Sequence, residues 1–149
     1  MSSNRYDYIV VDTPSHFTDH VLAALDTTDH YVLVTTPEIP SLKNLRLTLD
    51  MFDLLHYARE QRLIVFNRSD DKTGLTAADI ESTVKAPITA HIPSSRDVPV
   101  SINKGVPLAQ SEPKHPVSAA IRQFVTLSIA RETAMEGRRF ARRKPVRNR

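Results

Sequence analysis

The sequence predicts an α/β domain, in which a parallel sheet of about four strands carries helices on both faces. Two observations support this prediction. Short apolar runs rich in β-branched residues alternate with segments whose apolar residues recur at helical spacing, and this alternation is typical of parallel sheets joined by right-handed crossovers. Polar residues also follow the apolar runs, at the strand ends where open α/β sheets bind ligands.

Four stretches are predicted to be buried strands because each is a continuous apolar run that stops at a turn signal. They are residues 8–12, 31–36, 62–67 and 87–92. Pro87 is acceptable at the first position of a strand. The parallel order of these strands would bring their carboxyl ends to one edge of the sheet.

The segments between and after these strands have the 3.6-residue period of amphipathic helices. Helices are predicted over residues 17–26, 41–57 and 76–84, then over a short segment ending at Lys104, and finally after Pro116. The residues expected on the buried faces are Phe17, Val21, Leu22 and Leu25; Leu42, Leu45, Leu49, Phe52 and Leu55; and Val117, Ala120, Ile121, Phe124, Leu127 and Ile129.

Residues at the helix ends agree with these boundaries. Thr18 is suited to be an N-cap, because its hydroxyl can accept a hydrogen bond from an N–H of the first turn. Thr76 and Asp79 have the spacing of a capping box. Gly105 follows Lys104 where a left-handed residue commonly ends a helix.

The composition restricts the class of protein. A chain of 149 residues with 40% hydrophobic and 25% charged residues is an ordinary single globular domain. There is no Cys, no apolar run of the ~20 residues that span a bilayer, and no signal peptide at Met1, so we expect a cytoplasmic protein. The six His residues lack metal-site spacing, and no Ser lies in a hydrolase elbow.

The charge is unevenly distributed. Residues 131–149 hold eight Lys or Arg against two Glu, a balance of +6, whereas the whole chain carries +3. The first 130 residues therefore sum to −3. We expect a folded domain over residues 1–130 and a basic, disordered tail over residues 131–149.

Three predicted strands end in polar residues: Asp12, Thr35 with Thr36, and Asn67. Taken alone, the first of these stretches is more typical of a core strand whose Asp12 opens a turn or caps the next helix. Asn67 can likewise satisfy its own turn. Both residues also stand where a ligand crevice would form.

Four segments, in order, resemble the carboxyl-terminal half of the MinD/ParA class of deviant-Walker P-loop ATPases, and within it the CpaE/TadZ-like pilus-assembly branch. The similarity runs from about Tyr6 to about Val125. The first segment, YDYIVVDTP at residues 6–14, resembles the Walker B and switch II segment, and the second, TTPEIPSL at 35–42, is similar to the family's T-x-P-E-x-x-S motif. The third is LIVFNR at 63–68. The fourth, IP at 92–93 with SINKGVPL at 101–108, resembles the segment that closes over the base.

The resemblance implies ATP and Mg²⁺ as ligands of a partial P-loop NTPase-like sheet. Asp12 would be the Walker B residue on the magnesium side, and Asn67, Arg68 and Pro93 would lie on the adenine side. Ser15 and His16 depart from the Pro or Gly that the family usually has there, which affects the switch segment.

A larger departure from the family concerns the loop that binds the phosphates. The family's K-G-G-x-G-K-[ST] loop holds them with backbone N–H groups and a Lys, whereas the three Gly of this sequence, at positions 74, 105 and 137, form no such loop. We therefore expect the chain to be inactive as an ATPase on its own. Without the phosphate-loop strand, the strand of Asp12 and the strand of Tyr31 would either pair directly or leave a gap that requires a partner chain.

These observations lead to one functional prediction and two alternatives. The prediction is a truncated MinD/ParA/CpaE-like ATP-binding protein of cell positioning or of pilus or secretion assembly, at the membrane only through partners. The first alternative is a non-enzymatic module, associating with itself or docking onto a full-length ATPase or pilus component through residues 12–26 and 41–57. The second is binding of nucleic acid or anionic lipid by the tail from Arg138 to Arg149.

Overall fold

The computed structural model describes residues 6, 8–70, 74–75 and 77–129. In this part of the chain, one parallel sheet has the strand order β1-β2-β3. Its strands are β1 (Tyr31–Thr35), β2 (Arg62–Asn67) and β3 (Ala90–Ile92). Val34 of β1 pairs with Val65 of β2, and Val65 pairs in turn with Ala90 of β3. The predicted α/β class is confirmed.

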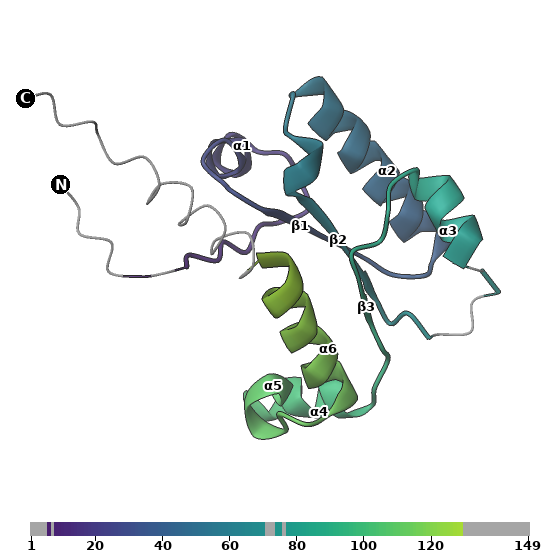
Figure 1. Ribbon diagram of the computed structural model, residues 1–149. Helices are drawn as coiled ribbons and strands as arrows, with labels where there is room; N and C mark the ends of the chain where they lie inside the picture. Colours follow the sequence, from purple (N-terminus) through teal and green to yellow (C-terminus); the bar gives the residue numbers. More distant parts are fainter. Residues whose placement is uncertain (1–5, 7, 71–73, 76, 130–149) are drawn as a thin grey trace, which may run out of the picture.

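Helices lie on both sides of this sheet (Figure 1). The helices α2 (Ile39–Leu54) and α3 (Ala77–Val84) cover one face, and α4 (Asp97–Lys104), α5 (Leu108–Ser111) and α6 (Pro116–Phe124) cover the other. The helix α1 (Asp19–Leu25) lies beside the start of β1. A 3₁₀ turn at Arg59–Gln61 leads into β2, and a π-helical turn at Val125–Ile129 follows α6.

Each face of the sheet has its own apolar core. The core below α2 and α3 consists of Leu42, Leu45, Leu49, Ile64, Phe66, Ile80 and Val84. The core below α5 and α6 consists of Val65, Ile92, Leu108 and Val117. The predicted inner stripe of the second helix is therefore buried, apart from Leu55, which is the C-cap of α2 and remains exposed.

Two predicted helix ends are confirmed. The Thr18 hydroxyl accepts a hydrogen bond from the Val21 N–H at 3.4 Å, and Gly105 ends α4 with a left-handed φ of 67°. A third cap was not predicted: His115 Nδ1 accepts the Val117 N–H at 3.1 Å and starts α6. Thr76, half of the predicted capping box, lies outside the described residues.

An aromatic cluster attaches α1 and β1 to the end of α2. The Phe52 ring lies 5.1 Å from that of Tyr31, 5.2 Å from that of Tyr57 and 6.2 Å from that of Phe17. The Tyr57 hydroxyl donates a hydrogen bond to Asp26 at the end of α1, at 2.8 Å. Burial and this hydrogen bond raise the pKa of Tyr57 to about 12.

The raised pKa of Tyr57 predicts a loss of stability at alkaline pH. Because the fold favours the neutral phenol, the contribution of Tyr57 is complete below its ordinary pKa of 10.0 and is lost as the pH rises through about 12. We expect the free energy of unfolding to fall less steeply between these pH values in Tyr57→Phe than in the unmodified protein. Urea unfolding at a series of pH values measures this difference, and equal slopes would contradict it.

The predicted strand over residues 8–12 is wrong. These residues form no ladder, and the side chains of Ile9 and Val10 are 81% and 93% exposed. A β-branched run becomes a strand only beside another strand, because its backbone groups need partners. Here β1 pairs with β2 alone among the described strands, and residues 11–17 are separated from it by a hollow. Of the two expected outcomes, direct pairing or a gap, the structure shows the gap.

Candidate functional site

The carboxyl end of β1 is fastened to the start of α2 by hydroxyl groups. Thr35 is buried, and its Oγ1 lies 3.0 Å from Ser41 Oγ, which also accepts the Thr36 N–H at 3.2 Å. Pro40 occupies the first turn of the helix, where its missing N–H costs nothing. The T-x-P-E-x-x-S pattern thus has a structural reason: its first and last residues close the turn at the edge of the sheet.

Removal of the Ser41 hydroxyl should cause a measurable loss of stability. We expect Ser41→Ala to lower the free energy of unfolding by about 1–2 kcal/mol, because the Thr36 N–H and the buried Thr35 hydroxyl both lose a partner. Thr48→Ala is the matched control, since the Thr48 hydroxyl bonds only the Asn44 carbonyl of its own helix. Chemical denaturation measures both variants, and equal effects would contradict the role given to Ser41.

Three of the four predicted site residues lie together at this edge of the sheet. Asn67 ends β2, and its register partner Ile92 immediately precedes Pro93. The Ser69 N–H donates to the Ile92 carbonyl at 3.0 Å, which holds the loops after the two strands side by side. Arg68 directly follows Asn67 and reaches toward the β1 side, where its guanidinium is 3.5 Å from the carboxylate of Glu38, the N-cap of α2.

The side chain of Asn67 also serves its own turn. Its Oδ1 accepts the Arg68 N–H at 3.0 Å, and Arg68 has a left-handed φ of 55°. The turn-satisfying alternative therefore describes the oxygen of Asn67 in this structure. A ligand that contacts Asn67 would meet an amide whose orientation is already fixed by the backbone.

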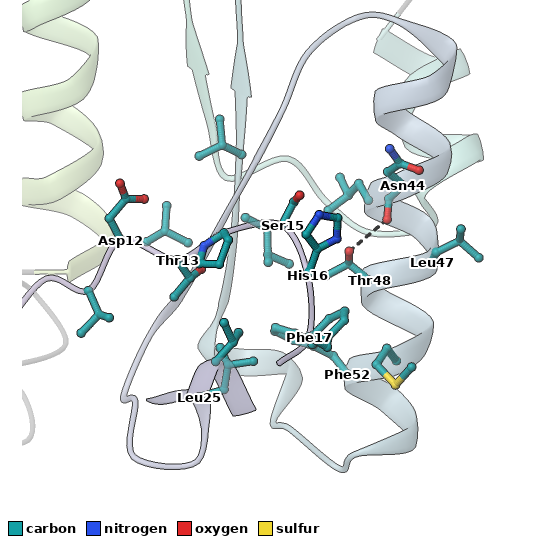
Figure 2. Close-up of a pocket in the computed structure, with 18 of the residues that line it drawn as sticks. Asp12, Thr13, Ser15, His16, Phe17, Leu25, Asn44, Leu47, Thr48 and Phe52 are labelled. Atoms are coloured by element: carbon teal, nitrogen blue, oxygen red, sulfur yellow. Dashed lines mark hydrogen bonds between the residues drawn. The ribbon is translucent and has the colours of Figure 1, made fainter. Parts of the chain in front are cut away.

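Asp12 lies apart from these three residues. It is exposed and lines a hollow of about 860 Å³ between residues 11–17, β1 and one side of α2. Figure 2 shows its carboxylate well away from Ser15, His16 and Asn44, which also line the hollow. Asn67, Arg68 and Pro93 are not among the lining residues. The predicted site residues therefore occupy two places.

Several residues at these places were not singled out from the sequence. Glu38 pairs with Arg68, and Asp70 accepts the Ser94 N–H across the loops after β2 and β3. A second apolar stripe on α2, made of Leu47, Met51 and Leu54, is exposed. Its spacing of four and then three residues was visible in the sequence, and it signals a helix with two apolar faces.

A magnesium site is not complete in the described part of the chain. No group of three or more His, Cys, Asp or Glu side chains is gathered there. Mg²⁺ requires near-octahedral oxygen ligands and is usually held by one or two carboxylates together with water and phosphate oxygens. Asp12 supplies one such carboxylate, so these residues alone do not make a nucleotide–magnesium site.

Comparison with known proteins shows which proteins this chain is similar to. No protein-family model matches the chain. It is 29% identical to the septum site-determining protein MinD of Thermotoga maritima over 110 residues, which cover 70% of this chain and 41% of that protein. The structure matches a ParA family ATPase from Chlorobium tepidum with a TM-score of 0.67 and 27% identity, over 73% of this chain and 46% of the other. The chain has the MinD/ParA-type P-loop ATPase fold.

The chain covers only part of the MinD/ParA-type proteins that it matches. The MinD cell division protein of Aquifex aeolicus matches 98% of this chain at 24% identity, with a TM-score of 0.69, but only 58% of that protein is covered. The chain spans about two fifths of the length of the curated MinD relatives. The resemblance seen in the sequence is confirmed for the MinD/ParA fold, and the CpaE-like branch stays a prediction.

The solved relatives carry ligands or partners of their own. MinD from Pyrococcus horikoshii was solved as a complex with Mg-ADP, and MinD from Aquifex aeolicus as a complex with MinC. In the described part of the present chain, no helix is long and apolar enough to cross a membrane. The basic residues 131–149 lie outside the described residues.

Proposed function

We propose that residues 1–149 form the Walker B and adenine side of a MinD/ParA-like ATP-binding unit, and that these residues do not hydrolyse ATP by themselves. The observation that carries the proposal is the gathering of Asn67, Arg68 and Pro93 at one edge of a MinD/ParA-type sheet. That edge is where open α/β folds bind ligands.

The side chains at this edge suit a purine base. Pro93 offers an apolar surface to a flat ring, and the Asn67 amide offers a hydrogen-bonding group at the end of β2. The Arg68–Glu38 pair borders the same edge on the β1 side. By resemblance, Asp12 would act on the magnesium side of the nucleotide.

The phosphates would find few partners on these residues. Nucleotide affinity and phosphoryl transfer depend mainly on backbone N–H groups, a Lys and the metal around the phosphates. The sequence contains no Gly-rich loop of that kind, and Asp12 is the one Walker-type carboxylate that the resemblance identifies. ATP hydrolysis by residues 1–149 therefore requires groups that they do not contain.

The process served would be one of intracellular positioning, because the curated relatives are septum site-determining proteins. The CpaE/TadZ-like features of the sequence extend the proposal to pilus or secretion assembly. Association with an ATPase of the same type would place the protein at the membrane through partners. The partner-binding alternative is favoured by a specific observation: within the described residues, no strand other than β2 pairs with β1.

Nucleotide assays on the purified chain test the proposal. We expect residues 1–149 to show no ATP hydrolysis above that of Asp12→Ala, and to bind Mg-ATP no more tightly than the millimolar range, about −4 kcal/mol. Micromolar ATP binding, together with hydrolysis that Asp12→Ala abolishes, would contradict it. Asp19→Ala, in the first turn of α1, is the matched control for loss of an exposed carboxylate.

A further inference from the structure

We propose that the Glu38 carboxylate binds the 2′ and 3′ hydroxyls of the nucleotide's sugar, so that this edge of the sheet distinguishes a ribonucleotide from a deoxyribonucleotide. The inference rests on the proposed function, because it assigns a further residue and a specificity to the same site. Four observations on Glu38 support it: its absence from the closing of the turn, the poor satisfaction of its carboxylate, its exposure, and its place among the predicted site residues.

The first observation is that the Glu38 carboxylate does not hold the turn in which it lies. Glu38 is the N-cap of α2, but its side chain makes no capping hydrogen bond. Residues that cap well have shorter polar side chains. The turn from β1 into α2 is closed instead by the hydroxyls of Thr35 and Ser41. The carboxylate is therefore available for another contact.

The second observation is that this carboxylate is poorly satisfied. Its Oε1 lies 3.5 Å from the Arg68 guanidinium, which is longer than the about 2.7–2.9 Å of a strong charge-assisted hydrogen bond. Its Oε2 is covered and has no hydrogen-bond partner among the described residues. A covered acceptor without a donor is unfavourable. A ligand that brings O–H donors to this carboxylate would relieve that deficit.

The third observation is that the Glu38–Arg68 pair is open to a ligand. The Arg68 side chain is 53% exposed and the Glu38 side chain 43% exposed. Exposed ion pairs contribute little to stability, so the two side chains can shift at small cost. The carboxylate can therefore turn Oε2 outward without breaking a contact on which the fold depends.

The fourth observation is the order of the site residues across the sheet. Pro93 follows β3, Asn67 ends β2 and Glu38 follows β1, and the strands have the order β1-β2-β3 (Figure 1). Asp12 lies beyond β1, across the hollow. The sugar of a nucleotide lies between its base and its phosphates. With the base beside Asn67 and Pro93 and the phosphates toward Asp12, as in the proposed function, the sugar comes next to Glu38.

The chemistry of a carboxylate suits this part of a nucleotide. Both of its oxygens accept hydrogen bonds, and the 2′ and 3′ hydroxyls of ribose are two neighbouring donors. Phosphate groups would be repelled by the charge of Glu38, so they are poorer partners for it. A sugar without the 2′ hydroxyl would leave one carboxylate oxygen unpaired, and such unpaired groups are what allows a site to reject an analogue that lacks a hydroxyl.

An NMR titration with AMP and 2′-deoxy-AMP over the millimolar range tests the proposal, because the two nucleotides differ only in one hydroxyl. We expect residues 1–149 to bind AMP about fivefold more tightly than 2′-deoxy-AMP, measured on the backbone amides of Asn67 and Arg68. Glu38→Ala should reduce this ratio to about one. Glu60→Ala is the matched control and should leave the ratio unchanged, because Glu60 is exposed and lies in the 3₁₀ turn before β2, at the opposite edge of the sheet.

Equal binding of the two nucleotides by the unmodified protein would overturn the proposal, and so would a preference for AMP that survives in Glu38→Ala. The dispersion of the amide spectrum verifies that the variant folds. Glu38→Gln keeps the length of the side chain and is a second variant, in which the ratio should also fall.

The role of Glu38 and the proposed nucleotide function can be told apart in the same titration. If Asn67→Ala weakens the binding of both nucleotides while the unmodified protein shows no preference between them, the nucleotide function stands and the role of Glu38 is refuted. Binding of neither nucleotide would refute both.

Discussion

Phe52→Ala is expected to lower the free energy of unfolding by about 3–5 kcal/mol, the range for loss of a buried aromatic ring. The ring is 1% exposed and packs edge-to-face against Phe17, Tyr31 and Tyr57. Its removal would leave a cavity where α1, β1 and α2 meet. Urea denaturation measures the change.

The control for this substitution is Leu54→Ala, two residues further along the same helix, where the side chain is exposed. We expect it to change the free energy of unfolding by less than about 0.5 kcal/mol, as is usual for surface positions. A small effect of Phe52→Ala, close to that of Leu54→Ala, would show that the aromatic cluster does not hold α1 and β1 to α2.

Arg62→Ala is expected to destabilise the protein by about 2–3 kcal/mol, because a buried Arg loses both its packing and its hydrogen bonds. The Arg62 side chain is 7% exposed, and its guanidinium bonds the Tyr57 carbonyl and, at 2.7 Å, the Asp53 carboxylate. It also lies 5.6 Å from the centre of the Phe52 ring. The first residue of β2 thus fixes the loop that follows α2.

Arg59→Ala distinguishes the effect of burial from the effect of charge, because Arg59 and Arg62 pair with the same Asp53 carboxylate. Arg59 also pairs with Asp53, at 2.6 Å, but its side chain is 77% exposed, so we expect a loss of less than about 1 kcal/mol. Hydrogen bonds from Arg62 and then Arg59 hold the pKa of Asp53 below its ordinary value. NMR titration should show that pKa rising more in Arg62→Ala than in Arg59→Ala. The opposite order would contradict the leading role of Arg62.

The parts of the fold that the sequence predicts best are those whose partners lie within the chain. The predicted strand over residues 62–67 coincides with β2, because both of its faces are buried and its apolar run is continuous. The inner stripe of α2 was predicted for a similar reason, since its 3.6-residue period reflects burial against β2 and α3.

Residues 8–12 show what local sequence cannot decide. Their composition favours a strand as strongly as that of β1, yet a strand exists only where another supplies hydrogen-bonding partners. The same limit applies to the site. The meeting of Asn67 and Pro93 follows from parallel strand order, whereas the separation of Asp12 from them depends on a gap that no local pattern encodes.

Mg-ATP binding by residues 1–149, measured by calorimetry, tests the central claim most directly. We expect residues 1–149 to bind Mg-ATP no better than the millimolar range, about −4 kcal/mol. Asn67→Ala should weaken that binding further, while Asp19→Ala should not. Micromolar binding with ATP hydrolysis, or binding that Asn67→Ala leaves unchanged, would contradict the claim that these residues form one side of a MinD/ParA-like nucleotide site.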